Sequence, residues 1–228
     1  MLRKLIAAVG LGAPAASNAL AAPPYEPYKN SATNEIYNLL FCDAPSAFEP
    51  RRGASPAEWQ VSLFADPTDT FTLLALAADP SQEGRVRYLA YTKLRRLGHQ
   101  VPTKVLLGVI VEVPLAGGLD VLAAYSEGGV RYLNQSGKLA VFEGVEALQP
   151  LVRNVFTASE VVVARIGPWD KPRRPPPASG NVRLTFLVSD GLYFGEGPMS
   201  TMQREPMAGP VIKLAGELLR SVVAMSAK

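Results

Sequence analysis

The chain has 228 residues, of which 48% are hydrophobic and 19% charged, and this balance excludes a disordered chain. The formal net charge is +3, but Arg3 and Lys4 lie in an acid-free segment, residues 1–22, and the remainder carries only +1 (21 basic minus 20 acidic residues). Nucleic-acid binding is therefore not expected, since it needs a clustered basic face.

Residues 1–22 contain the parts of a secretory signal peptide. A basic start precedes a short apolar run, Pro14 interrupts that run, and small residues stand at Ala19 and Ala21. This pattern predicts that residues 1–21 are a signal peptide, cleaved after Ala21, and that the protein is periplasmic or secreted. The alternative is a cytoplasmic protein that keeps this segment as a tail.

The next region is predicted to be extended and then helical. Residues 22–30 form a proline-rich, extended lead-in, and residues 31–228 are expected to fold as a single domain. A helix follows, with Ser31 or Thr33 as its cap. Three later helices are predicted from dipeptides that join a capping residue to a proline, and their ranges are 56–64, 67–78 and 80–97. The first of these ranges also alternates like a strand, and Gly98 should end the last helix.

Apolar, β-branched segments separated by glycine turns predict a four-strand antiparallel meander. Its strands are residues 105–113, 119–125, 130–134 and 139–142. A helix over 150–166 and an exposed proline-rich loop over 168–180 come next. Asp190-Gly191 indicates a hairpin between residues 182–188 and 192–194. A final amphipathic helix covers about 208–225. The predicted fold class is α+β, with a single, mostly antiparallel sheet of about six strands packed by amphipathic helices.

The expected register of the meander predicts a dry face and a semi-polar face. Pairing Pro114 with Leu119, and Tyr125 with Val130, places Tyr132 opposite Ala123. The semi-polar face then contains Leu106, Ile110, Glu112, Val121, Tyr125, Tyr132 and Asn134, whereas Leu107, Val109, Val111, Leu122 and Leu133 lie on the other. Tyr125, Tyr132 and Asn134 are the candidate binding residues. A slip of one residue would reverse this assignment.

Glu112 is the candidate catalytic residue, because it interrupts an apolar strand. A carboxyl group that loses water there has a raised pKa and can act as a general acid or base. The alternative is an ordinary solvent-facing or paired glutamate. Asp120 should point to the opposite face, so the register supplies no second carboxylate.

The predicted helix 80–97 is rich in basic residues. Arg85, Arg95 and Arg96 are candidate binding residues for an anionic partner, and the alternative is the solvated side of an amphipathic helix.

The residue counts argue against a metal or cofactor. Cys42 and His99 are the only cysteine and histidine, so no Cys/His zinc pattern exists. Gly10 and Gly12 resemble a dinucleotide fingerprint, but the proline-rich lead-in replaces the helix and strand that this fingerprint needs. No cofactor is expected.

The leading hypothesis is a non-catalytic binding or accessory protein that is exported and recognises an unidentified protein or small molecule. One alternative is a hydrolase-type enzyme that uses carboxylate chemistry around Glu112. The other is a cytoplasmic interaction module that uses the basic helix. No run is apolar enough to span a membrane once a signal peptide is removed, and the oligomeric state is open.

Overall fold

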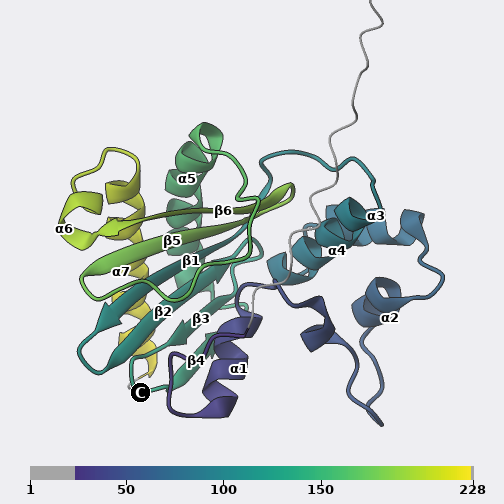
Figure 1. The fold of residues 1–228 in the computed structure, drawn as a ribbon, viewed down its shortest axis with the longest axis horizontal. Helices are drawn as coiled ribbons and strands as arrows, with labels where there is room; N and C mark the ends of the chain where they lie inside the picture. Colours follow the sequence, from purple (N-terminus) through teal and green to yellow (C-terminus); the bar gives the residue numbers. More distant parts are fainter. Residues whose placement is uncertain (1–23, 227–228) are drawn as a thin grey trace, which may run out of the picture.

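The computed structural model describes residues 24–226, and its centre is one antiparallel sheet of six strands in the order β4-β3-β2-β1-β5-β6 (Figure 1). The predicted α+β class, meander and C-terminal hairpin are confirmed. The predicted signal peptide lies outside the described residues. The strands are β1 (Leu106–Leu115), β2 (Gly118–Tyr125), β3 (Val130–Leu133), β4 (Leu139–Phe142), β5 (Asn181–Val188) and β6 (Gly191–Pro198).

Helices cover both faces of this sheet. They are α1 (Ser31–Leu39), α2 (Glu58–Phe64), α3 (Thr70–Ala78), α4 (Gly84–Arg96), α5 (Gln149–Arg165), α6 (Met199–Met202) and α7 (Ala208–Ser226). Side chains of α5 and α7 form a core with one face, and those of α1 and α4 form a core with the other. In Figure 1, α7 runs behind the strands and α1 in front of them, while α2 and α3 lie beside α4.

Strand β1 lies inside the sheet and contributes to both cores. It pairs with β2 on one side and with β5 on the other. Val109 and Val111 face α5 and α7, whereas Ile110 and Glu112 face α1 and α4. The predicted semi-polar face is thus a buried face, because the N-terminal helices cover it.

The predicted register is right for the first hairpin and wrong for the second. Glu112 pairs with Val121, as expected. In the second hairpin Ala124, not Tyr125, pairs with Val130, so Tyr132 lies opposite Leu122. This slip moves Tyr132 to the α7 side of the sheet and Leu133 to the α4 side. Its cause is the turn, in which Tyr125 N–H donates to the Gly129 carbonyl and adds Gly129 to the paired residues.

A second correction concerns the start of β1. The pairing between β1 and β5 shifts between Leu106 and Gly108, which indicates a bulge. Leu106 consequently packs with α5 and α7, and Leu107 packs with α4, the reverse of the prediction.

The starts of the N-terminal helices differ from the predicted ones. Asn30, rather than Ser31 or Thr33, caps α1, which therefore begins earlier than expected. The next three helices begin later than the proline signals indicate. Asp69 caps α3, three residues after Asp66, and α4 begins only at Gly84 although Asp79 accepts from Ser81 N–H. An aspartate before a proline stabilises a turn as well as a helix start, so the dipeptide alone does not fix the first helical residue. Gly98 does follow α4 with a φ of 81°.

None of the helices between residues 24 and 226 is long and apolar enough to cross a membrane.

Candidate functional site

Glu112 is fully buried in the middle of the sheet. Its exposed fraction is 0%, and the Tyr37 hydroxyl on α1 donates to Glu112 Oε1 over 2.7 Å. Glu112 Oε2 accepts no hydrogen bond, and the nearest cation is Arg183 Nη1 at 3.6 Å. Burial raises the pKa of this carboxyl, and the opposing effects of Arg183 and Tyr37 do not cancel that shift.

Glu112 belongs to a row of three charged residues that crosses neighbouring strands. Arg183 on β5 pairs with Glu112 on β1, and Glu196 on β6 pairs with Arg183. Arg183 donates to Glu196 Oε2 from Nε at 3.1 Å and from Nη2 at 2.7 Å. Although burial opposes the shift, the hydrogen bonds from Arg183 lower the pKa of Glu196. The pKa values of the two carboxyls of the row are thus shifted in opposite directions.

The proline-rich loop 168–180, called the strap below, is attached next to this row. Arg183 Nη1 and Nη2 donate to the strap carbonyls of Arg174 and Pro175 at 3.1 and 2.6 Å. The Tyr25 hydroxyl donates to the Arg173 carbonyl at 2.7 Å. Three consecutive strap carbonyls therefore accept hydrogen bonds from side chains outside the strap.

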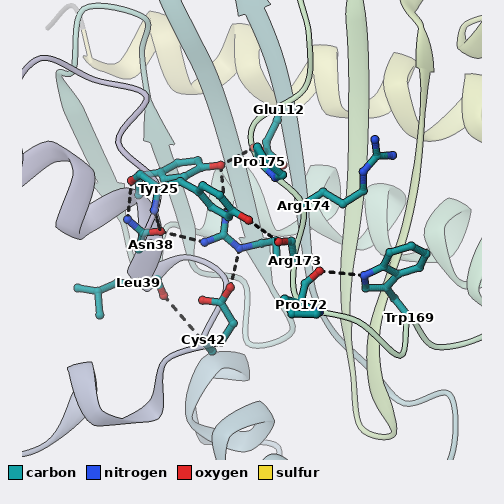
Figure 2. Close-up of polar contacts among 12 residues, drawn as sticks. Tyr25, Asn38, Leu39, Cys42, Glu112, Trp169, Pro172, Arg173, Arg174 and Pro175 are labelled. Atoms are coloured by element: carbon teal, nitrogen blue, oxygen red, sulfur yellow. Dashed lines mark hydrogen bonds and ion pairs between the residues drawn. The ribbon is translucent and has the colours of Figure 1, made fainter. Parts of the chain in front are cut away.

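Arg173 of the strap is buried, which corrects the prediction of a wholly exposed loop. Its exposed fraction is 5%, and its guanidinium lies among polar and aromatic side chains (Figure 2). We call the surrounding set the arginine cage, and its members are Tyr25, Tyr37, Asn38, Phe41 and Asp43.

Every nitrogen of the Arg173 guanidinium has a partner in the arginine cage. Nε donates to Asp43 Oδ2 at 2.6 Å, Nη2 donates to Asn38 Oδ1 at 2.9 Å, and Nη1 lies 3.3 Å from the Tyr37 hydroxyl. The guanidinium carbon lies 3.9 Å from the centre of the Phe41 ring. Such stacking adds to the ion pair, because a cation is attracted to an aromatic face.

Three carboxyls and three arginines meet in this region. The carboxyls are those of Asp43, Glu112 and Glu196, and the cations are Arg173, Arg183 and Arg174. Arg174 is half-exposed, and its Nη1 lies 3.7 Å from Glu196 Oε2. Arg173 and Arg183 are therefore the only buried cations of this set, and each gives its hydrogen bonds to groups other than Glu112.

The remaining sheet candidates are dispersed. Tyr125 is fully buried, and its hydroxyl donates to the Leu40 carbonyl at 3.1 Å. Asn134 stabilises the turn before β4, where its Oδ1 accepts from Ser136 N–H and Lys138 N–H, both at 3.0 Å. Tyr125 and Tyr132 lie on opposite faces of the sheet, so these two candidates do not share one surface.

Tyr132 instead lines a cavity between the sheet and α7. This α7 cavity has a volume of about 540 Å³. Its apolar walls include Val111, Val113, Leu122, Ile212 and Leu219, and its polar lining residues include Asp120, Tyr132, Lys213, Glu217 and Arg220. The Tyr132 hydroxyl donates to Asp120 Oδ2 at 3.0 Å. As predicted, Asp120 lies on the face opposite Glu112.

The basic residues of α4 mostly make internal contacts. Arg85 Nε donates to Glu83 Oε1 at 2.6 Å, and its guanidinium carbon lies 5.4 Å from the centre of the Tyr125 ring. Arg95 donates to the Ser189 carbonyl and to Thr92. Arg96 alone of the three candidates is exposed.

Cys42 and His99 add no reactive group to this site. Cys42 is buried, and burial raises the pKa of its thiol, which disfavours the thiolate. His99 is exposed, with Nε2 3.4 Å from Thr70 Oγ1. Within residues 24–226, no group of three or more His, Cys, Asp or Glu side chains could hold a metal ion.

Sequence reasoning found Glu112 but missed Tyr37, Arg173, Arg183 and Glu196. A usable signal existed only in the C-terminal hairpin, where a short turn brings the following strand back alongside β5 and so pairs Arg183 with a residue near Glu196. The arginine cage had none, since it joins segments about 130 residues apart. Comparison with known protein families finds no match, and comparison with curated proteins finds no relative.

Proposed function

We propose that this chain is an exported, non-catalytic binding protein that takes a small amphipathic molecule into the α7 cavity. One observation carries the proposal, which is the cavity of about 540 Å³ between α7 and strands β1 to β3. That volume lies in the range of small-molecule sites, which are concave, mostly apolar and supplied with a few polar groups.

The lining of the α7 cavity supports a ligand with an apolar body and an anionic group. Aliphatic side chains from the sheet and α7 form the walls. Lys213 and Arg220 are exposed at the cavity, and no ion pair within 4.0 Å involves either of them in the described part of the chain. Asp120, in contrast, already accepts from Tyr132 and from Gln135 N–H.

The test uses 1-anilinonaphthalene-8-sulfonate, an apolar ring system that carries a sulfonate. Gly216 lines the cavity, and the nearest atom to a Cβ added there is Arg220 Nη1 at 3.9 Å. Gly216→Phe should therefore fill the cavity without a backbone clash and reduce probe binding at least tenfold. Ala224→Phe, at an exposed position of α7 outside this lining, is the control. Equal binding by the wild type and Gly216→Phe would reject the proposal.

A second candidate function is hydrolase-type chemistry in the row of Glu112, Arg183 and Glu196. The observation that favours it is the opposite direction of the two carboxyl pKa shifts. Environments that push two pKa values apart are typical of acid and base pairs. The burial of Glu112 argues against this second candidate, because a substrate has no access to its carboxyl while the strap is attached.

Hydrolysis of a panel of chromogenic esters and glycosides tests this second candidate. Loss of turnover in both Glu112→Gln and Glu196→Gln would support it. Absence of turnover by the wild type across the panel, or unchanged turnover in the two variants, would count against it.

A further inference from the structure

The strap packs against a surface that has the features of a peptide-binding site. This surface, called the strap site, consists of the arginine cage and Arg183 of β5, and its polar contacts are directed at one side chain and at backbone carbonyls of the strap. Figure 2 shows the contacts of the arginine cage. We propose that the strap site recognises an arginine in a proline-rich segment, that residues 172–175 occupy it in cis, and that a partner protein with such a segment competes for it.

The first support is the completeness of the arginine cage. A carboxylate, an amide oxygen, a hydroxyl and aromatic rings surround one guanidinium, whose side chain is 2% exposed. A lysine ammonium cannot reproduce the planar arrangement of donors that reaches Asp43, Asn38 and Tyr37 together. The cage is therefore selective for arginine over lysine.

The second support is that the hydrogen bonds which the strap accepts beyond the cage reach its main-chain carbonyls. Tyr25 and Arg183 donate to the carbonyls of residues 173, 174 and 175. Pro172, Arg174 and Pro175 are exposed. One buried anchor combined with main-chain hydrogen bonds is the way that peptide-binding domains hold short extended segments.

The third support is the chemistry of the occupant. The segment reads Pro172-Arg173-Arg174-Pro175. Proline fixes φ and keeps such a segment extended before binding, so it loses little conformational entropy when it docks. A partner segment with arginine between prolines would accept from the same donors, Tyr25 and Arg183, at the same low cost in conformational entropy.

Competition in cis sets the expected affinity. A short tether holds the strap at an effective concentration of roughly millimolar. A free peptide with the same contacts must approach that concentration to displace the strap. Replacement of Arg173 by alanine empties the cage and removes much of this competition, because Arg173 is the buried side chain that anchors the strap.

The experiment measures binding of a fluorescent peptide with the sequence of residues 169–178. Its protein arms are the wild type, Arg173→Ala and the matched control Arg174→Ala, which removes the same charge from an exposed neighbour. Arg173→Ala should bind the peptide at least tenfold more tightly than the wild type or Arg174→Ala. A peptide with alanine at the position of Arg173 should lose at least tenfold in affinity for Arg173→Ala, and one with lysine there should lose a comparable factor.

Two results would overturn the proposal. One is a folded Arg173→Ala protein that binds no peptide, and the other is equal affinity for the arginine and alanine peptides. If Arg173→Ala does not fold, a measurement on the wild type tests the proposal instead. Hydrogen exchange at the strap amides should then accelerate with several millimolar arginine peptide and not with the alanine peptide, and equal exchange would reject the proposal. A concentration-dependent wild-type dimer that Arg173→Ala abolishes would assign the strap site to a second copy of this chain and overturn the proposal of a different partner protein.

Discussion

Glu112 and Arg183 hold paired positions on neighbouring strands, yet the arginine gives its hydrogen bonds to other groups. Arg183 Nη1 lies 3.6 Å from Glu112 Oε2, whereas Nη2 donates to Glu196 at 2.7 Å and to the Pro175 carbonyl at 2.6 Å. Arg183 therefore serves mainly to hold β6 and the strap. Glu112 is left with one hydrogen bond, and this relationship makes its protonation the most informative quantity to measure.

Replacement of Glu112 by glutamine should change how stability depends on pH. The folded protein retains the Glu112 proton above the ordinary pKa of about 4.3. Between that value and the raised folded pKa, the unfolded state binds fewer protons than the folded state, so this residue lowers the free energy of unfolding as pH rises. The slope contributed is at most about 1.4 kcal/mol per pH unit.

Urea unfolding of the wild type and Glu112→Gln across pH 4 to 8 checks this expectation. The wild type should lose stability relative to the variant as pH rises, because glutamine cannot titrate. If the difference in free energy of unfolding between the wild type and the variant is constant with pH, Glu112 has the same pKa in the folded and unfolded states, and the expectation is wrong. Glu160→Gln, at an exposed position of α5, is the control.

Replacement of Arg183 by methionine should destabilise the fold strongly. The variant loses every hydrogen bond from Arg183 to Glu196 and to the strap carbonyls, and it leaves Glu196 with the half-exposed Arg174, at 3.7 Å, as its only ion-pair partner among the described residues. Breaking such a pair costs about 3 kcal/mol or more. Arg153→Met on the exposed side of α5 should stay within about 0.5 kcal/mol of the wild type. Equal urea midpoints for the two variants would contradict the role assigned to Arg183.

Replacement of Gly84 by alanine should destabilise the protein although it lies in a helix. Helix propensity alone predicts a gain of about 1 kcal/mol. A Cβ at this position, however, would collide with the Leu107 carbonyl oxygen of the bulged start of β1. We expect a net loss of about 1 kcal/mol, since overpacking a tight contact costs about 1–3 kcal/mol and the propensity gain offsets part of that cost.

Gly167→Ala provides the matched control for this loss, because a Cβ there meets nothing within 4 Å. Its unfolding temperature should differ little from that of the wild type. A stabilised Gly84→Ala would show that α4 does not approach β1 as closely as described.

Processing of the N-terminus can be tested independently of the fold. If residues 1–21 are a signal peptide, mass spectrometry of the protein from its native host should find Ala22 as the first residue. A mature chain that begins at Met1 or Leu2 would support the cytoplasmic alternative.

The sheet could be predicted from the sequence because its signals are local. Residues 105–113 are β-branched and apolar, and short glycine turns separate the following strands, which makes a meander the simplest arrangement. Glu112 could be found for the same reason, as a single acid in that apolar run. Helix starts were less certain, because Asp79 stabilises a turn before α4 begins at Gly84.

The partners of Glu112 could not be predicted, because they depend on pairings that no local pattern specifies. Arg183 reaches Glu112 only because β5 adds beside β1, and Arg183 meets Glu196 only because the turn residues are Ser189 and Asp190. The predicted Asp190-Gly191 turn is displaced by one residue, and Gly191 already pairs with Val188. In the second hairpin of the meander, a pairing shift of one residue changed the face on which Tyr132 lies.

The strand order also sets when during synthesis Glu112 acquires its neighbours. Tyr37 and the first two strands precede β5 by many residues, so a growing chain contains Glu112 long before Arg183 exists. Until the ribosome has produced β5, one side of β1 has no strand beside it. A nascent chain that stops before residue 181 should consequently remain open at β1 and be a preferred substrate for chaperones that bind exposed strands.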